Sequence, residues 1–273
     1  MSTNTVDNLK KVTTTTVARM KRDSEKIAMI TAYDYTMASL VDRAGIDLIL
    51  VGDSAANVMA GHATTLPITL DQMIYHAQCV VRGVERAMVI VDMPFGTCDG
   101  DELTALRSAV RILKETGAAA VKIEGGKAML PSIEKIISAG IPVMGHLGLT
   151  PQSVNQLGGY GLRAKAKEEA ERLMEDALML QAAGCFALVL EKVPAQLAAE
   201  VSSRLTIPTI GIGAGAGCDG QVLVLQDMLV MNEGFKPKFL RTYANLSETI
   251  NSAVGQYISD VKGGTFPSEA ESY

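Results

Sequence analysis

Acidic residues follow short apolar runs at two places in the first third of the chain. The run Leu48–Val51 leads within two residues to Asp53 and Ser54, and the run 88–91 ends on Asp92. Apolar runs of this length are typical of strands buried on both faces, so each acid would lie at the tip of a buried strand. A carboxylate held there can bind a cation, and a hydroxyl can bind an oxyanion. The alternative for each residue alone is an Asx turn or a helix cap.

Further polar side chains occupy the same position after later apolar runs. They are Lys122 and Glu124 in the run that begins at Ala119, His146 after 141–144, and Glu191 after 187–190. Lys122 and Glu124 are two residues apart, so in a strand both point to the same side as Ala120. If Ala120 faces the inside of a barrel, both charges line its mouth. A buried lysine there needs a carboxylate or an anionic substrate; the alternative is an ion pair that only closes the barrel.

Three of these acids indicate a metal ion. Asp53, Asp92 and Glu124 would repel one another without a cation between them. Oxygen ligands without cysteine, and with at most one histidine nearby, favour a magnesium-type ion over zinc. A 2-oxo acid could complete the ion's shell, and the ion would act as a Lewis acid on an enolate. Glu191, at the end of an apolar strand, could have a raised pKa suited to proton transfer. The alternative is a set of helix caps and surface salt bridges.

The elements that must position these residues form a regular alternation. Eight strands are predicted, at 27–30, 48–51, 88–91, 119–123, 141–144, 187–190, 209–212 and 222–225, with helical patterns between them. Parallel strands need such long crossovers. Eight units in a chain of 273 residues favour an α/β fold of the closed (β/α)8 TIM-barrel type over an open doubly wound sheet. In such barrels the active site lies at the C-terminal ends of the strands, where the polar residues are predicted.

The two ends of the chain differ from this alternation. Residues 1 to about 12 are polar, which predicts a mobile arm, and Val17–Lys21 is amphipathic enough to cover one end of the barrel. We therefore expect an arm and short capping helix at 1–25. A single barrel domain is expected at 26–273. It includes a last helix at 245–261.

Charge and composition exclude several classes of partner. The net charge is -5 and Lys and Arg form no block, which argues against a nucleic-acid partner. The apolar runs are shorter than the roughly 20 residues of a membrane helix, and the N-terminus has no apolar signal core. The four cysteines are widely spaced, as expected for small buried thiols. We expect a cytoplasmic protein that binds small molecules and no membrane.

Seven groups of residues in order along the chain match one known family. They are Ile30-Thr-Ala-Tyr-Asp34, Val51-Gly-Asp-Ser54, Gly61-His62 with Thr65-Leu-Pro-Ile-Thr69, Asp92-Met-Pro-Phe95, Val121-Lys-Ile-Glu-Gly-Gly126, Gly145-His-Leu-Gly-Leu-Thr-Pro-Gln-Ser153, and Ile210-Gly-Ile-Gly-Ala-Gly215 with Asp219-Gly-Gln-Val222. Together they resemble the ketopantoate hydroxymethyltransferases. The resemblance extends from about Ile27 to Pro267.

The resemblance implies a metal-dependent (β/α)8 enzyme of pantothenate and coenzyme A biosynthesis. Such an enzyme transfers a hydroxymethyl group from 5,10-methylenetetrahydrofolate to 3-methyl-2-oxobutanoate, with water, and yields 2-dehydropantoate and tetrahydrofolate. The implied route is formation of a Mg-stabilised enolate, followed by attack on the folate-borne methylene carbon. The family usually forms decamers, so the resemblance also implies a homo-oligomer.

Matched motif by motif, the resemblance also implies roles for individual residues. The implied ligands of Mg²⁺ are Asp53 and Asp92, with support from Glu124. The implied substrate-binding residues are Asp53, Ser54, Asp92 and Lys122, and the implied proton acceptor is Glu191. His146, at the end of its predicted strand, is a further candidate for substrate binding.

Four short segments depart from the family pattern. Ala55-Ala56 replaces the usual Leu-Gly, the loop Gly159–Ala164 differs, Gln226 replaces a histidine, and the C-terminus ends Glu269-Ala-Glu-Ser-Tyr273. These departures would affect the packing behind the metal ligands, the folate contacts and the closure of a lid. Two other functions stay open on the sequence alone: a Mg-dependent lyase or mutase of the phosphoenolpyruvate-like barrel group, and a catalytically idle barrel.

Overall fold

The computed structural model describes residues 10–98 and 101–273, so residues 1–9 of the predicted arm lie outside the described residues. The chain divides into two compact units. The first ends at Leu223, and the second is Val224–Tyr273. The predicted division at residue 25 is therefore not where these two units separate.

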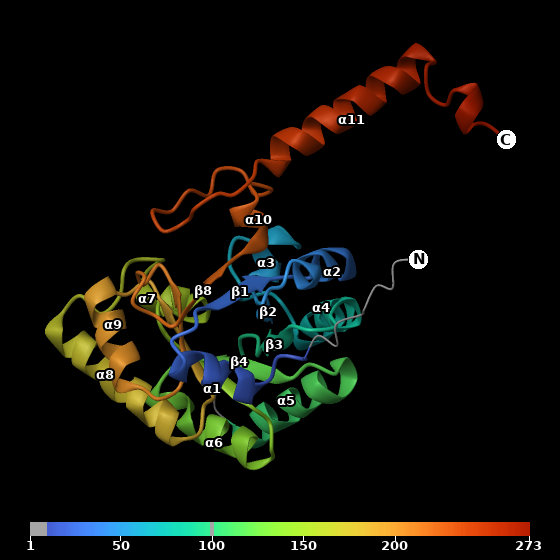
Figure 1. Cartoon of the computed structure of the whole chain (residues 1–273). Coiled ribbons are helices and arrows are strands. Elements are labelled where there is room, and N and C mark those ends of the chain that lie inside the picture. Colours follow the sequence, from blue (N-terminus) through green and yellow to red (C-terminus); the bar gives the residue numbers. More distant parts are fainter. Residues whose placement is uncertain (1–9, 99–100) are drawn as a thin grey trace. The chain divides into compact units, whose positions relative to one another are not determined.

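Eight parallel strands close into a barrel in the order β1 to β8 (Figure 1). The strands are β1 (Ile27–Thr31), β2 (Leu48–Val51), β3 (Met88–Asp92), β4 (Ala120–Glu124), β5 (Val143–Gly148), β6 (Ala187–Glu191), β7 (Thr209–Ile212) and β8 (Gly220–Leu223). Strand β1 pairs with β2 on one side and with β8 on the other. The predicted (β/α)8 barrel is confirmed, and the open sheet is excluded.

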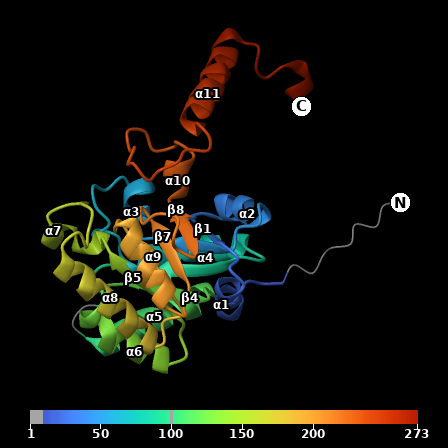
Figure 2. The ribbon, with the colours of Figure 1, turned by 60° about the vertical axis from the view of Figure 1, so that its left-hand side comes forward.

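Helices surround the strands in the two views of Figures 1 and 2. The longer ones in the first unit are α1 (Thr14–Arg22), α2 (Tyr35–Arg43), α4 (Leu70–Gly83), α5 (Glu102–Thr116), α6 (Leu130–Ser138), α8 (Lys167–Ala182) and α9 (Ala195–Arg204). Four short elements also follow strand ends: α3 (Ala55–Val58), η1 (Lys127–Met129), η2 (Pro151–Ser153) and α7 (Val154–Leu157). The site described below lies at the strand ends from which these short elements start.

Local sequence signals determine where helices begin and end. At the start of α4, the Thr69 hydroxyl accepts from Gln72 N, while Gln72 Oε1 accepts from Thr69 N. This reciprocal pair satisfies two backbone donors that a helix start leaves free. At the end of α5, Gly117 adopts φ 78°, a left-handed conformation that glycine tolerates best.

Alternate strand residues face two separate apolar clusters. Inside the barrel lie residues such as Met29, Leu48, Ile90 and Ala120, while their neighbours along the strands pack outward against the helices. Ala120 therefore faces the interior, as expected. Because side chains two residues apart share a face, the side chains that follow it in β4 also point inward, toward the barrel mouth.

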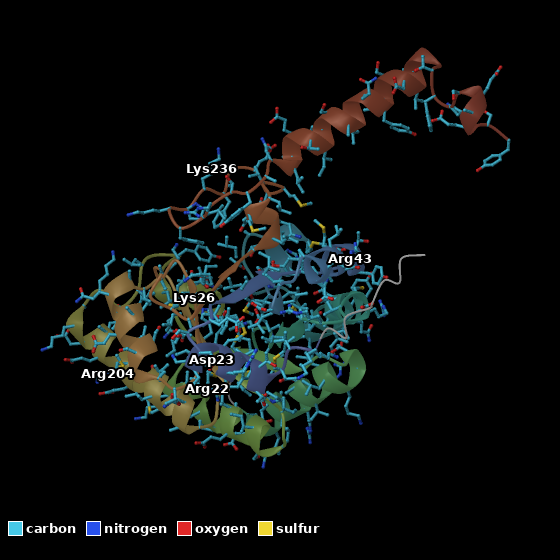
Figure 3. The ribbon with its side chains drawn as sticks, in the orientation of Figure 1. Arg22, Asp23, Lys26, Arg43, Arg204 and Lys236 are labelled. Atoms are coloured by element: carbon cyan, nitrogen blue, oxygen red, sulfur yellow. The ribbon has the colours of Figure 1, made fainter. Side chains whose placement is uncertain are left out.

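Helix α1 covers the end of the barrel opposite the predicted site. Val17 and Met20 belong to the interior cluster, and Lys21 Nζ lies 2.7 Å from the Asp219 carboxylate just before β8. Arg22, Asp23 and Lys26 mark the turn from α1 into β1 (Figure 3). The predicted capping helix is confirmed, and it extends beyond the predicted amphipathic stretch Val17–Lys21 at both ends.

The last strand begins two residues earlier than predicted. Strand β8 is Gly220–Leu223, and Gln226 and Asp227 belong to the following helix α10 (Leu225–Met228). A Cβ at position 220 would lie 2.4 Å from Ile27 O, so only glycine allows the backbone to pair this closely with β1. Because β8 starts and ends two residues earlier than predicted, Gln226 and Asp227 lie in α10. The sequence pattern had put them at the end of the strand.

The second unit contains α10, the long helix α11 (Leu246–Gly263) and the short helix η3 (Glu269–Glu271). The predicted final helix is confirmed, and the Asn245 side chain caps it by accepting from Glu248 N. None of its residues is buried. Among the described residues, no helix has both the length and the apolar character that a membrane crossing requires.

Candidate active site

The structure brings the predicted polar residues to one rim of the barrel. Asp92 pairs in register with Lys122, and Glu124 pairs with His146. Asp53 follows β2 by two residues, and Glu191 ends β6. All these positions are at the C-terminal ends of parallel strands, so the closed sheet places residues that are far apart in sequence around one opening.

The backbone of Asp53 contacts the carboxylate of Asp92. Asp53 N donates to Asp92 Oδ2 at 3.0 Å, and both side chains are buried. Burial, together with the charges of Glu124 and Asp92, raises the pKa of Asp53 to about 8. Burial also raises the pKa of Asp92, although Lys122 opposes it. Burial is the largest cause of both shifts, and it makes the charged form of each carboxyl group costly unless a cation compensates it.

Lys122 is the cation at the centre of the rim. Its Nζ lies 3.2 Å from Asp92 Oδ1 and 3.7 Å from Glu124 Oε1, and its side chain is only 4% exposed. Burial lowers the pKa of Lys122, but the charges of Asp92, Glu124 and Asp53 outweigh burial and raise it above its usual range. The ammonium group is therefore charged. The predicted pairing of this lysine with carboxylates is confirmed.

His146 connects the acids of β4 and β6. Its Nδ1 lies 3.3 Å from Glu124 Oε1, and its Nε2 lies 3.4 Å from Glu191 Oε2. Burial and the charge of Lys122 lower the pKa of His146, and the contacts with Glu124 and Glu191 outweigh them, so it rises to about 9. Nδ1 also lies 3.1 Å from Lys122 Nζ. Because a protonated Nδ1 cannot accept from an ammonium group, we assign its proton to the Glu124 contact.

The charges of the rim do not balance. Four carboxylates, those of Asp53, Asp92, Glu124 and Glu191, meet two cations, Lys122 and His146. The pKa of Glu124 is nevertheless lowered, because its contacts with His146 and Lys122 outweigh the effect of burial. Two negative charges therefore lack a partner when all the groups are ionised, and the excess lies on the side of Asp53 and Asp92. This side of the rim could hold a divalent cation.

Gln152 holds two of the acids and was not among the predicted site residues. Its Nε2 donates to Asp53 Oδ2 at 2.9 Å and to Met93 O at 3.0 Å, while its backbone N donates to Glu124 Oε2 at 3.0 Å. One residue of η2 thus fixes one oxygen of each carboxylate, while the other oxygen of Glu124, Oε1, contacts His146 and Lys122. The sequence signals for it were its place in the polar segment that follows β5 and its presence in the motif 145–153.

Tyr33 is a second residue that the sequence analysis missed. Its hydroxyl lies 2.7 Å from Ser54 Oγ, and its ring is buried. His76 Nδ1 on α4 lies 2.8 Å from Tyr33 O, so this histidine supports the backbone from outside the barrel. Burial, the largest influence, raises the pKa of Tyr33. The phenol therefore stays protonated and can orient the Ser54 hydroxyl.

The described residues offer no self-sufficient metal cage. Among them, no group of three or more His, Cys, Asp or Glu side chains is arranged to hold an ion by itself. A magnesium ion does not require such a cage, because it commonly takes one or two carboxylates and fills its shell with water or substrate oxygens. Asp92 Oδ1 suits this role, since it is buried and the cation it faces among the described residues is Lys122, whose Nζ lies 3.2 Å away.

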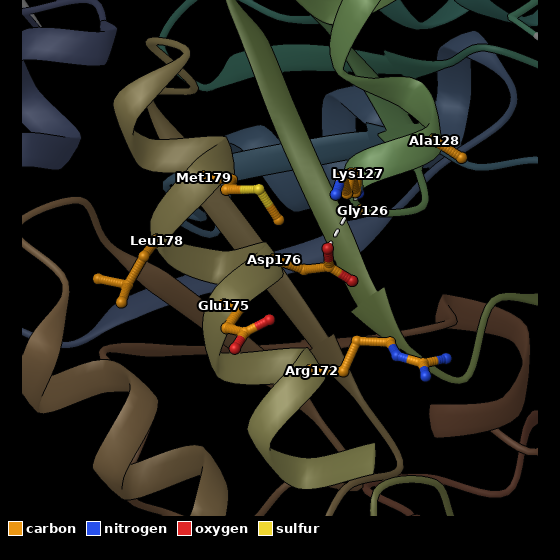
Figure 4. A pocket seen from close by; sticks show the side chains of 8 residues that line it. All are labelled: Gly126, Lys127, Ala128, Arg172, Glu175, Asp176, Leu178 and Met179. Atoms are coloured by element: carbon orange, nitrogen blue, oxygen red, sulfur yellow. Dashed lines mark hydrogen bonds between the residues drawn. The ribbon is translucent and has the colours of Figure 1, made fainter. Parts of the chain in front are cut away.

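A separate cavity of about 690 Å³ lies outside the rim, between residues 126–128 and α8 (Figure 4). Asp176 points into it and accepts from Lys127 N at 3.0 Å. None of the predicted site residues lines this cavity. It is therefore distinct from the charged rim.

We predict that replacing the central cation destabilises the fold. Lys122→Met leaves the surrounding carboxylates buried without their cation, so the free energy of unfolding should fall by about 3–5 kcal/mol. Urea unfolding without divalent cations measures the change. The exposed Lys114→Met on α5 serves as a control and should change it by less than about 0.5 kcal/mol.

A double variant separates charge from packing. Lys122→Met with Asp92→Asn removes both charges of the pair and should recover part of the lost stability. Equal stability of Lys122→Met and the unchanged protein would show that the buried charges are not coupled as described.

Comparison with known proteins shows the family to which the chain belongs. Residues 11–269 match the family model described as ketopantoate hydroxymethyltransferase. The 3-methyl-2-oxobutanoate hydroxymethyltransferase of Flavobacterium johnsoniae is 62% identical over 264 residues, which cover 97% of each chain.

Two solved structures share the fold. The 2,3-dimethylmalate lyase, a member of the PEP mutase/isocitrate lyase superfamily, has a TM-score of 0.61 at 17% identity and covers 94% of this chain and 87% of its own. Phosphonopyruvate hydrolase in complex with oxalate and Mg²⁺ has a TM-score of 0.60 at 11% identity and covers 95% and 93%. Identities this low show the fold alone. The family match and the 62% identity decide the assignment: the chain belongs to the ketopantoate hydroxymethyltransferase family and is a hydroxymethyltransferase enzyme.

Proposed function

We propose that the chain transfers a hydroxymethyl group from 5,10-methylenetetrahydrofolate to 3-methyl-2-oxobutanoate and so forms 2-dehydropantoate and tetrahydrofolate. This reaction would place it in pantothenate biosynthesis, in the cytoplasm. The observation that carries the proposal is the buried, negatively charged rim of Asp53, Asp92 and Glu124 around Lys122, in a chain of this family. The roles proposed below for the acids, for Lys122 and for Glu191 are those that the family resemblance implies.

Mg²⁺ is the proposed metal ion. Asp53 and Asp92 would hold it, with support from Glu124, because these are the acids of the rim where negative charge is in excess. When bound, Mg²⁺ would stabilise negative charge on the keto oxygen of the 2-oxo acid. A barrel of the same fold was solved with Mg²⁺ and oxalate, a small ligand with two carboxylates, which supports such a pairing here.

The remaining cations would bind the anionic substrate. Lys122 is charged and buried, so it can attract the keto and carboxylate oxygens of 3-methyl-2-oxobutanoate. The Ser54 hydroxyl, oriented by Tyr33, can donate to the same carboxylate. His146 would add a second positive charge between Glu124 and Glu191. Charge-assisted contacts of this kind are strong where water is excluded.

Glu191 is the proposed proton acceptor. Its side chain is 16% exposed, whereas those of Asp92 and Glu124 are 3% and 5% exposed, so it is the acid of the rim that is most open to solvent. It would take the proton from C3 of the 2-oxo acid, and C3 would then form a bond to the methylene carbon of the donor. Water supplies the hydroxyl of the product. The two folate nitrogens regain one proton from water and one from C3 through Glu191.

The activity assay uses 3-methyl-2-oxobutanoate, 5,10-methylenetetrahydrofolate and Mg²⁺. The unchanged protein should form 2-dehydropantoate. Asp92→Ala should lose Mg²⁺-dependent turnover, and Glu191→Gln should lower kcat by about 10²–10⁴-fold, the usual contribution of a general base. Circular dichroism checks that both variants fold.

One result would contradict the proposal. If the folded protein produced no 2-dehydropantoate, the transferase assignment for this chain would fail. Cleavage of a carbon–carbon or carbon–phosphorus bond without folate would then favour the lyase or mutase alternative. Absence of every such activity would favour an idle barrel.

A second prediction concerns Gln152 and the metal ion. Gln152→Ala removes the amide that holds Asp53 Oδ2 and leaves the backbone contact with Glu124 in place. Loss of such a supporting contact should weaken Mn²⁺ binding, measured by electron paramagnetic resonance of the free ion, by about 10–100-fold. Gln156→Ala, an exposed glutamine on α7, is the control. An unchanged dissociation constant in Gln152→Ala would show that the amide does not position a metal ligand.

The proposed assembly is a homo-oligomer, and the family resemblance implies a decamer. Helix α11 supports association, because it carries a stripe of exposed apolar side chains: Ile250, Val254, Tyr257, Ile258 and Val261 are 45–56% exposed. Their spacing places them on one face of the helix. We propose that a second copy of the chain covers this face.

The oligomer prediction is tested with a charged substitution in the stripe. Val254→Glu should reduce the molar mass measured by light scattering after size-exclusion chromatography, because an unpaired carboxylate in an apolar interface is unfavourable. Ser252→Glu, on the opposite face, should leave the mass unchanged. An unaltered mass in Val254→Glu would remove α11 from the proposed interface.

A further inference from the structure

The loop between α7 and α8 is fastened to the strand that carries Glu191. Lys192 follows Glu191 directly, and its Nζ donates to the carbonyl oxygen of Tyr160. Arg163 N donates to Lys192 O at 2.8 Å, and Lys192 N donates to Ile212 O at 2.8 Å. Lys192 has φ 46°, a left-handed backbone conformation that costs energy for a non-glycine residue. Its backbone and side chain together tie the loop to the barrel rim.

This tether places the backbone of Tyr160 next to the end of β6, at the rim. The ring is 45% exposed, so one part of it is free to contact a ligand. Partial burial raises the pKa of Tyr160, and so do the negative charges of Asp53 and Glu191. Those two acids belong to the β2 and β6 sides of the rim. The loop that Lys192 anchors therefore lies beside the Glu191 end of β6.

The two proposed substrates differ in what they need from the protein. The 2-oxo acid is small and anionic, and the buried Lys122 and Ser54 suit it. The one-carbon donor carries a flat pterin ring that must lie close to C3 of the oxo acid yet cannot enter the buried, charged floor. Aromatic side chains stack on flat heteroaromatic rings with little dependence on the pattern of hydrogen-bonding groups. A half-exposed aromatic ring at the rim is suited to this ligand.

We infer that Tyr160 forms a wall of the donor subsite and stacks on the pterin ring of 5,10-methylenetetrahydrofolate, with Lys192 as the positioning residue that holds the ring in place. The inference rests on the proposed function, because it names the subsite for the second substrate of that reaction. It also gives a role to the segment 159–164, where the chain departs from the family pattern.

The experiment separates binding of the donor from chemistry on the oxo acid. Proton exchange at C3 of 3-methyl-2-oxobutanoate in D₂O, followed by NMR with Mg²⁺ and no folate, reports only the oxo-acid half of the site. Turnover with varied 5,10-methylenetetrahydrofolate reports the donor. Tyr160→Ala should raise the KM for the donor about tenfold or more, while the exchange rate stays within about twofold of that of the unchanged protein.

Two further variants test whether the ring itself is responsible. Tyr160→Phe keeps the ring and should keep the donor KM close to that of the unchanged protein. Tyr75→Ala removes an exposed ring on α4 and is the matched control. Isothermal titration with tetrahydrofolate should show the same order of affinities, with Tyr160→Ala the weakest.

The possible results distinguish failure of the inference about Tyr160 from failure of the proposed function. An unchanged donor KM and tetrahydrofolate affinity in Tyr160→Ala would overturn the inference while exchange and turnover kept the proposed function intact. An equal loss in Tyr160→Phe would also overturn it, because the hydroxyl and not the ring would then be the contact. If the unchanged protein showed neither exchange nor turnover, the proposed function would fail first, and the donor subsite would fail with it.

Discussion

The structure depends on an excess of buried negative charge at one rim of a closed barrel. Carboxylates that approach one another away from water are costly unless a cation or a proton compensates them. Lys122 and His146 compensate part of the charge, while burial, and after it the charges of Glu124 and Asp92, raise the pKa of Asp53 to about 8. The barrel can sustain this arrangement because its apolar strands and helices stabilise the fold elsewhere, and because each charged group is fixed by a strand end. An incomplete charge balance is also what supports the proposed binding of a cation and a polar substrate at the rim.

The contacts around the acids determine which oxygen atoms remain available. Gln152 occupies one oxygen each of Asp53 and Glu124, and the backbone of Asp53 occupies one oxygen of Asp92. The other oxygens of Asp92 and Glu124 face Lys122 and His146, so contacts at both oxygens fix the orientation of these two carboxylates. A similar contact lies farther out, where Lys192 links the loop of Tyr160 to the strand of Glu191. The two proposed substrates would thus meet between a rigid, charged floor and an aromatic wall that is tied to it.

Most of the fold and much of the site could be predicted from the sequence, because both follow from periodicity. Buried parallel strands read as short apolar runs, and a charged residue at the end of each run must lie at the same rim once the sheet closes. The two-residue spacing from Ala120 to Lys122 and Glu124 gave their direction correctly. Gln152 and Tyr33 could not be found in this way, since their roles depend on the path of the segments between strands and on hydrogen bonds between elements distant in sequence. The start of β8 was misplaced for a similar reason: the close approach of Gly220 to Ile27 is a property of the closed barrel and leaves no apolar signal.

The central claim is that Asp53 and Asp92 share one divalent cation with a 2-oxo acid. Anomalous X-ray diffraction from crystals grown with Mn²⁺ and 3-methyl-2-oxobutanoate tests it most directly, because the scattering locates the ion independently of the protein atoms. The account predicts one strong peak within about 2.3 Å of an oxygen of each aspartate, at the range expected for oxygen ligands of such ions, with the oxo acid completing the shell. A peak at another part of the chain, or an occupied substrate pocket with no ion between these two carboxylates, would contradict it.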